Sequence, residues 1–469
     1  MASSNSPPAL THFRIEIGGA GVAHLIFDMS GASMNVLSDA VIEDFGRFTD
    51  WFLSSEARAL VIRSAKPVFC TGGDLSELSA AYDRISTLPI LARFEAAKAH
   101  FASMGRHLRR LETSGKPVAV AIGGLALGGG CEIALTGHYR VLAQARPAML
   151  GLPEVVVGLL PGAGGTQRLP RLIGLEKSLP LLLDGARLSS SQALMAGLVD
   201  ELVAPGEEVA AAEAWALAAA AARQPWDRPG FVLPDADSWK ATLRAARAKM
   251  LARTQGNDPA PIALFDCLEA GLDCEMDAAL EIEGAAFAKL IQRPEPRNMI
   301  RALFMGAQEH ARRSKAGALS AEISKTGEYI ADGLAGAVRR ELEAGVMSEA
   351  LDSALGRLGF PHRVSSMIGR ASESLARTES ADPCPVSGGA FWFEAAGAAD
   401  AGRIARRLLD GASSAFAAPS VEVAGPERLI IDHVAVRDHG FPAWIGGPFA
   451  WLDQSRPGAP AFALSEMRE

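Results

Sequence analysis

The sequence has little cysteine and no long apolar run. Five of its 469 residues are cysteine, and the absence of a Cys-x-x-Cys pair argues against a disulfide framework and a zinc ribbon. Glycines or charges interrupt the most apolar stretches, Val118–Leu135 and Ala210–Ala222, so neither supplies the ~20 apolar residues of a membrane span. Met1–Pro8 lacks the basic and apolar regions of a signal peptide. We therefore expect a soluble, cytoplasmic protein with reduced cysteines.

An excess of positive charge is also missing. The chain has 46 Lys and Arg against 54 Asp and Glu, a formal net charge of −8. This balance argues against a nucleic-acid-binding surface and a polybasic membrane patch. The 49% of hydrophobic and 21% of charged residues are typical of a globular chain. The length allows about three domains of ~150 residues each.

The hydrophobic pattern changes near residue 205. Before it, a helical run over Ile90–Leu111 and others like it alternate with short strand-like runs, which predicts crossover units and a mostly parallel sheet. The strand-like runs are Phe13–Ile17, Val22–Phe27, Ala59–Arg63, Val118–Ile122 and Tyr139–Ala143. After it, the pattern predicts helices over 210–223, 258–272 and 276–291, and again over 311–469 with a loop-rich break at 380–389.

Three glycine-containing segments carry the functional signal: Phe69–Leu75, Ala126–Ala134 and Gly151–Arg168. Glycine at a turn lets backbone N–H groups approach a ligand, and the second segment opens a helix whose first N–H groups lack partners. One N–H from each of the first two loops could converge on a thioester oxygen as it becomes enolate-like, forming an oxyanion hole. For any single loop, tight packing of helix on strand is an equal alternative.

Glu132 and Glu154 are the carboxylates of these segments, and both have apolar neighbours in sequence. Such surroundings raise the pKa of a carboxyl group by desolvation, which suits acid–base catalysis. The alternative for either residue alone is a helix cap or a solvent-facing side chain. His138 is interpreted as structural, and Cys70 and Cys131 as packing residues rather than nucleophiles, because no histidine pairs with them in a recognisable pattern.

Taken together, VFCTGGDL (68–75), LALGGGCEIAL (125–135) and GLPEVVVGLLPGAGGTQRLPRLIG (151–174) resemble the crotonase (enoyl-CoA hydratase/isomerase) superfamily. Within it, the chain is most similar to the hydratase portion of the multifunctional fatty-acid oxidation proteins. The resemblance implies an α/β crotonase (ββα spiral) fold over 12–205, followed by connecting helices over 206–310. It also implies an acyl-CoA thioester as substrate.

The resemblance assigns roles to individual residues. It implies that Glu132 acts mainly as base and Glu154 mainly as acid on one shared water, and that the N–H groups of Gly73 and Gly129 form the oxyanion hole. The segment that borders coenzyme A would be Thr71, Gly72, Asp74 and Leu75. Gly73 stands where the family more often has alanine, which leaves the N–H donor in place. No metal is expected.

The second half departs from the multifunctional proteins. Between His310 and Gly345 no strand–GxGxxG–helix unit occurs, so we expect no bound NAD and no dehydrogenase activity. Residues 311–469 instead resemble the helical C-terminal domain of 3-hydroxyacyl-CoA dehydrogenase. The likeness rests on Glu343–Gly345, Gly359–Pro361, Gly389–Phe393 and Gly440–Pro448. Asp352 and Asp432, each followed by Gly-Phe-Pro, predict a duplicated helical module.

Three functions remain open at this point. The leading one is an enoyl-CoA hydratase that makes a 3-hydroxyacyl-CoA in β-oxidation. The second is a double-bond isomerase or another crotonase reaction, and because isomerases commonly need one carboxylate, the pair favours hydration. The third is a non-catalytic scaffold that docks a partner through its helical half, which would have no need of both glutamates. Expected partners are further copies of the chain or other β-oxidation enzymes.

Overall fold

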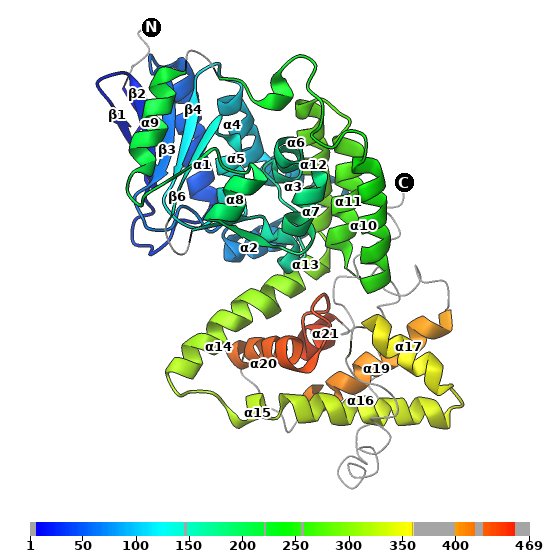
Figure 1. Ribbon diagram of the computed structural model, residues 1–469. Coiled ribbons are helices and arrows are strands. Elements are labelled where there is room, and N and C mark those ends of the chain that lie inside the picture. Colours follow the sequence, from blue (N-terminus) through cyan, green and yellow to red (C-terminus); the bar gives the residue numbers. More distant parts are fainter. Residues whose placement is uncertain are drawn as a thin grey trace. The chain divides into compact units, whose positions relative to one another are not determined.

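The computed structural model describes residues 6–144, 148–219, 222–254, 258–358, 360, 399–417 and 425–454. The chain divides into two compact units, one formed by 1–249 and 260–292 and the other by 250–259 and 293–469. Figure 1 labels the elements of both units for which there is room. The predicted domain boundaries near residues 205 and 310 stay predictions.

A six-stranded sheet forms the centre of the first unit, in the order β1-β2-β3-β4-β6-β9. Its strands are β1 (Phe13–Ile17), β2 (Val22–Phe27), β3 (Ala59–Ser64), β4 (Val118–Ile122), β6 (Tyr139–Ala143) and β9 (Glu201–Val203). β1 pairs antiparallel with β2, and all the other pairs are parallel. The five predicted strands and the mostly parallel sheet are therefore confirmed. The continuous apolar runs of β2 and β4 are buried throughout, as in sheets covered on both faces.

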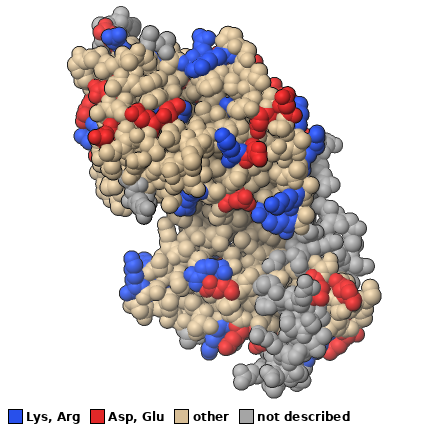
Figure 2. Space-filling model, viewed as in Figure 1, with Lys and Arg blue, Asp and Glu red and all other residues tan. Residues whose placement is uncertain are grey.

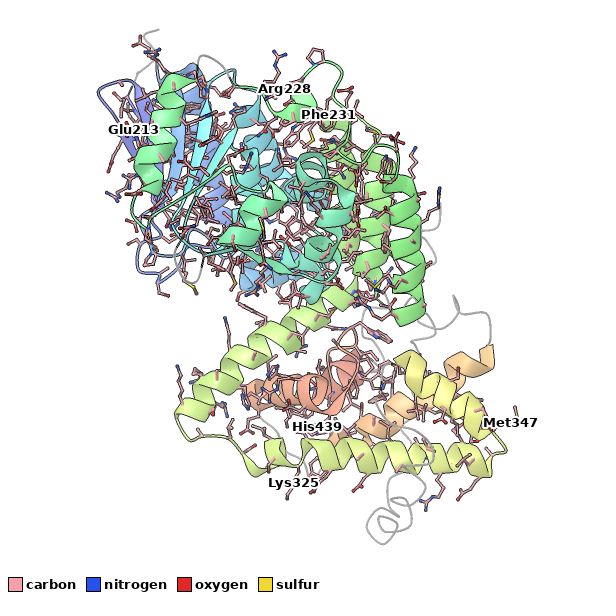
Figure 3. The ribbon with its side chains drawn as sticks, viewed as in Figure 1. Glu213, Arg228, Phe231, Lys325, Met347 and His439 are labelled. Atoms are coloured by element: carbon pink, nitrogen blue, oxygen red, sulfur yellow. The ribbon has the colours of Figure 1, made fainter. Side chains whose placement is uncertain are left out.

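Helices cover both faces of this sheet. Alternate strand residues on one face, such as Val61 and Ala119, pack under Ala212 and Ala216 of α9 (Glu208–Ala218). Glu213 of α9, labelled in Figure 3, reaches His24 of the same face (Oε1 to Nε2, 3.6 Å).

On the opposite face, Phe13 stacks on Phe27 and meets Phe45 of α1 (Asp39–Ser54) edge-on. The Ser38 side chain caps α1 by accepting the Val41 N–H. The central strands of the sheet are thus buried on both sides, whereas the edge strands β1 and β9 are partly exposed.

A second, three-stranded sheet joins two of the glycine segments. It consists of β5 (Ala126–Leu127), β7 (Met149–Gly151) and β8 (Arg187–Ser189). β5 runs parallel to β7, and β7 antiparallel to β8. Pairing of Leu127 with Gly151 places the turn before Glu132 beside the turn before Glu154.

The predicted helix over Ile90–Leu111 is two helices, α3 (Ile90–Phe101) and α4 (Ser103–Glu112), joined at Ala102. The Ser103 hydroxyl donates to the His100 carbonyl (2.6 Å), a local bond that competes with the helix ladder. The remaining helices up to residue 291 are α2 (Leu75–Ser86), α5 (Gly129–Thr136), η1 (Pro153–Val157), α6 (Gly165–Ile173), α7 (Leu175–Leu183), α8 (Ser190–Ala196), η2 (Pro225–Asp227), α10 (Trp239–Thr254), α11 (Pro259–Gly271) and α12 (Met276–Ile291).

The second unit is helical in its described residues. Its elements are α13 (Pro294–Met299), η3 (Ile300–Met305), α14 (Gly306–Lys315), α15 (Ala321–Ser324), α16 (Thr326–Glu343), α17 (Ser348–Leu358), α19 (Ala399–Ala417), α20 (Gly425–His439) and α21 (Pro448–Gln454). Leu334 of α16 and Leu351 and Leu355 of α17 are buried in one core with Leu408 of α19. Figure 3 labels Lys325, Met347 and His439 of this unit. Met347 is exposed in the turn between α16 and α17. The ring of His439 occupies the space beside Gly327.

The first Gly-Phe-Pro motif lies partly outside the described residues, because Gly359 and Pro361 are not described. The segment 389–393, on which the likeness to the dehydrogenase also rests, lies wholly outside them. The two phenyl rings are described, and Phe360 meets Phe441 edge-on at 5.6 Å. Each phenylalanine N–H returns to a carbonyl of the helix before it. The two phenylalanines thus both bond back to the preceding helix, to Leu355 and to Ala435, while the duplicated module stays a prediction.

Lys and Arg alternate with Asp and Glu on the described surface that faces the viewer in Figure 2. Within the described ranges, no helix has the length and hydropathy needed to cross a bilayer.

Candidate active site

Two of the glycine loops lie side by side in the first unit. Cys70 forms a parallel bridge with Ala126, and the Leu127 N–H donates to the Cys70 carbonyl (2.9 Å). A Cβ built on Gly72, whose φ is +101°, would lie 3.2 Å from the Leu127 carbonyl oxygen and 3.8 Å from the Gly129 nitrogen. The chain therefore needs glycine at 72 for this close approach.

The N–H groups of Gly73 and Gly129 are the predicted oxyanion donors. Leu37 bonds to the residues on either side of Gly73, donating to the Gly72 carbonyl (2.8 Å) and accepting from the Asp74 N–H (3.0 Å). Gly129 is the first residue of α5, so its N–H has no intrahelical acceptor. Neither N–H forms a hydrogen bond within the described residues. Both donors are available at adjoining turns.

Glu132 is held by the loop that precedes α6. It lies in the first turn of α5 and is only 3% exposed. Its Oε1 accepts the N–H groups of Ala163 and Gly165, both at 2.7 Å. Burial raises the pKa of this carboxyl, while the two N–H groups oppose that shift by stabilising the ionised form. Oε2 makes no hydrogen bond within the described residues.

Glu154 has a different environment. It lies in η1, and its Oε2 is enclosed without a hydrogen-bond partner among the described residues. Burial raises its pKa well above the usual value, and the negative charge of Glu132 raises it further. A Cβ built on Gly128, which has a φ of +54°, would come within 2.9 Å of the Glu154 Oε1. The two predicted carboxylates therefore meet at the glycine turn, with Glu132 the one that ionises first.

A third buried carboxylate, Glu283 of α12, was not predicted. It is 1% exposed and accepts the N–H groups of Gly164 and Thr166. Burial and the charge of Glu132 raise its pKa to about 8. Its position on one helical stripe with Met276 and Phe287, both buried, is the signal that could have indicated it, because a carboxylate on an apolar helix face needs a partner.

A buried ion pair supports the same loop. Arg168 of α6 and Glu112 of α4 are fully buried and bonded through two contacts, at 3.0 and 3.1 Å. The third guanidinium nitrogen of Arg168 donates to the Ala163 carbonyl (2.7 Å). Because Ala163 also donates to Glu132, the pair fixes a residue that contacts the candidate base.

Glu112→Ala is expected to destabilise the first unit by about 3–5 kcal/mol, since it leaves the Arg168 charge buried without its partner. Urea unfolding followed by circular dichroism measures this. The control is Glu281→Ala, which removes an exposed pair with Lys98 (2.7 Å) and should cost no more than about 1 kcal/mol. Equal midpoints for the two variants would contradict the assignment.

Local hydrogen bonds shape the segment that is predicted to border coenzyme A. Thr71 donates its N–H to the Asn35 carbonyl (3.0 Å). Asp74 caps α2 by accepting the N–H groups of Ser76 and Glu77, and Leu75 is the first residue of that helix. These contacts explain the shape of the segment, and its role in binding coenzyme A stays a prediction.

Asn35, which was not predicted, ties this region together. Its buried side-chain amide donates to the carbonyls of Phe27 and Phe69 and to the Ser64 hydroxyl. A lone asparagine carries no sequence signal for such a role.

The remaining polar residues near the site are structural. His138 accepts the Val118 N–H at Nδ1 (3.1 Å) and bonds to the Glu112 carbonyl through Nε2 (3.1 Å), and burial lowers its pKa to about 4. Burial also raises the pKa of the Cys70 thiol to about 12 and raises that of Cys131. A neutral imidazole and neutral thiols agree with the predicted packing roles.

The sequence profile described as "Enoyl-CoA hydratase/isomerase" matches residues 19–233. This part of the chain is similar to the enoyl-CoA hydratase/isomerase family. Both glycine loops, Glu132 and Glu154 lie inside the matched region, whereas Glu283 lies beyond it. The match confirms the crotonase fold predicted for the first half. It does not extend to the second unit, whose likeness to a dehydrogenase C-terminal domain stays a prediction.

Curated relatives match beyond the hydratase/isomerase region. The "Fatty acid oxidation complex subunit alpha" of Shewanella amazonensis is 35% identical over 303 residues, 63% of this chain and 41% of that protein. The protein of the same name from Shewanella frigidimarina is 33% identical over 65% of this chain and 42% of its own length. The chain thus spans about two fifths of the length of these relatives.

The solved structures to which this chain is similar include an enoyl-CoA hydratase from Bacillus anthracis. It is 23% identical, with coverage of 65% of this chain and 96% of that chain and a TM-score of 0.38. DspI from Pseudomonas aeruginosa is 26% identical, with coverage of 53% and 99% and a TM-score of 0.40.

Proposed function

We propose that the hydratase/isomerase region adds water to a trans-2-enoyl-CoA and gives a 3-hydroxyacyl-CoA. The observation that carries the proposal is the pairing of two carboxyl groups, whose pKa values are raised to different extents, beside two N–H groups that have no acceptor among the described residues. An ionised and a protonated carboxyl at one site provide a base and an acid at the same pH. The match to the hydratase/isomerase family and the names of the curated relatives support an acyl-CoA substrate in fatty-acid oxidation.

Glu132 is assigned as the base and Glu154 as the acid. Glu132 takes a proton from water as the water oxygen bonds to C3, and the electrons of the C2–C3 double bond move onto the thioester oxygen. The enolate then collapses and C2 takes the proton of Glu154. A proton passes from Glu132 to Glu154 through the next water and restores the starting state. The overall reaction adds one water, so no oxidant, reductant or redox cofactor is required.

The N–H groups of Gly73 and Gly129 are proposed to stabilise the enolate oxygen. A donor of this kind contributes most when it is already oriented and shielded from water. The Leu37 contacts around Gly73 and the start of α5 at Gly129 supply that orientation. Coenzyme A would then lie along Thr71–Leu75.

We expect the rate of hydration to depend on pH with a maximum. Activity falls as the pH drops through the raised pKa of Glu132, because the base becomes protonated. It falls again as the pH rises through the higher pKa of Glu154, because the acid loses its proton. Initial rates measured across the pH range in which the fold is stable test this, and a flat profile would contradict the two roles.

The second unit is proposed to have a packing or assembly role. Its buried hydrophobic cluster supports a packed helical unit. The curated relatives that are named as complex subunits favour association with other β-oxidation enzymes. We propose a cytoplasmic protein without dehydrogenase activity.

The decisive experiment uses the purified full chain on enoyl-CoA esters of increasing acyl length, followed by loss of enoyl absorbance. Hydration of at least one length is expected, and the product with NAD⁺ should give no NADH. A shifted double bond without hydration would favour the isomerase alternative. Absence of any reaction would favour the scaffold.

A further inference from the structure

The loop before α6 donates four consecutive N–H groups to two carboxylates in strict alternation. Ala163 and Gly165 donate to Glu132, both at 2.7 Å. Gly164 and Thr166 donate to Glu283, and the Thr166 hydroxyl donates to it as well. The loop is therefore held between a carboxylate from α5 and one from α12.

This alternation depends on the backbone of Gly164. Its φ of +107° is one that side chains rarely adopt, and a Cβ there would collide with the guanidinium of Arg168. Successive N–H groups consequently point in opposite directions, two toward Glu132 and two toward Glu283. Removing either carboxylate would leave buried N–H groups unpaired, and an unpaired buried donor is costly enough to move a loop.

Glu283 itself is held firmly by α12. That helix packs against α3, where Phe287 meets Phe101 with ring centroids 5.3 Å apart, and Lys98 pairs with Glu281 at the exposed edge (2.7 Å). Among the described residues, Glu283 forms no hydrogen bond with the two glycine loops and is bonded to the 163–166 loop instead. It acts on the site through these loop bonds, and its charge also interacts with Glu132 and Glu154.

We propose that Glu283 is a positioning residue, which fixes the 163–166 loop so that Ala163 and Gly165 keep their N–H groups on Glu132 and hold it as an ionised base. The role of Glu132 as base rests on the proposed function, whereas the geometry of the loop does not.

Among the described residues, few other charged or titratable groups lie near this loop. Arg168 of α6 contacts the Ala163 carbonyl and is paired with Glu112 of α4. From α11, the Cys267 sulfur lies 3.4 Å from the Thr166 hydroxyl, and burial raises the pKa of this thiol to about 12. Two further titratable groups are Glu154, whose pKa burial raises well above its usual value, and Cys131 of α5, whose pKa burial also raises so that the thiol stays neutral. Burial and the charge of Glu132 raise the pKa of Glu283 itself to about 8, so this carboxyl is mostly protonated well below that pH.

The test compares Glu283→Gln with Glu281→Gln, which lies on the same helix at the exposed edge. Gln can accept only one of the two loop N–H groups, so the loop should shift. We expect kcat to fall on the order of 10- to 100-fold with KM nearly unchanged. The acidic limb of the pH profile should move up by about 1 pH unit, because lost N–H bonds destabilise ionised Glu132. Glu281→Gln should match the wild type.

A fall in kcat without movement of the acidic limb would assign Glu283 a merely structural role and overturn the proposal, as would wild-type kinetics. Should Glu283→Gln fail to fold, Thr166→Val and Thr166→Ser take its place. The valine removes the hydroxyl that Glu283 accepts and should move the same limb upward, whereas serine should restore the wild-type profile. Identical profiles for both would also contradict the proposal.

An infrared titration separates this proposal from the proposed function. The band of the protonated Glu132 carboxyl is identified as the one missing from Glu132→Gln. Its midpoint should lie at higher pH in Glu283→Gln than in wild type, whether or not the protein hydrates enoyl-CoA. An unchanged midpoint would overturn the positioning role, while an inactive wild type with a shifted midpoint would overturn only the hydratase assignment.

Discussion

Glu154→Gln and Glu132→Gln are each expected to lower kcat for hydration by ~10²–10⁴, the usual contribution of a general acid or base. Gln is nearly isosteric with Glu, and at position 132 its amide oxygen can still accept the N–H groups of Ala163 and Gly165. The fold and thioester binding should therefore survive. Initial rates with an enoyl-CoA and binding of a saturated acyl-CoA by calorimetry measure the two effects separately.

The two replacements should fail at different steps. Glu154→Gln lacks the proton for C2, and Glu132→Gln lacks the base that activates water. Glu281→Gln, an exposed glutamate of α12, is the matched control and should keep wild-type kcat. Turnover near the wild-type level in either active-site variant would show that its glutamate has no catalytic role.

Gly129→Pro is expected to lower kcat by ~10²–10³ through loss of one oxyanion donor. Proline is tolerated in the first turn of a helix, so α5 should still form. Any side chain at 129 also collides with Leu37, whose Cδ1 would lie 2.3 Å from the new Cβ. Gly129→Ala carries this collision but keeps the N–H, and is therefore the matched control.

The difference in kcat between the proline and alanine variants isolates the donor. Both should show the same small decrease in thermal stability from the collision with Leu37. If alanine proved as inactive as proline, the loss would come from distortion of the loop, and the Gly129 N–H would have no assigned role.

Local sequence patterns were sufficient for five of the six strands of the main sheet and for choosing the two glutamates as candidates, but not for β9 or for the three-stranded sheet. A continuous apolar run such as Val118–Ile122 fits a strand covered on both faces, and its short length and β-branched residues favour a strand over a buried helix. Glu132 and Glu154 could be found because each adjoins a glycine turn within a short motif. By contrast, the break at Ala102 depends on one serine hydroxyl bond, which no periodicity indicates.

The parts that sequence could not reveal are contacts between distant segments. Thr166 and Glu283 are separated by 117 residues, and Arg168 and Glu112 by 56. Each pairing satisfies a buried polar group whose burial is known only once the helices are packed. The shared burial of Glu283 and Glu132 on one loop follows from the packing of α12 on α6, which local sequence does not specify.

Hydration in H₂¹⁸O and D₂O tests the central claim most directly, because it reports where both parts of the added water go. We predict that the wild-type protein gives a 3-hydroxyacyl-CoA carrying ¹⁸O on C3 and deuterium on C2, and that Glu132→Gln and Glu154→Gln each form this product far more slowly. A product with a displaced double bond and no ¹⁸O, or equal formation of the labelled product by the variants, would contradict the account.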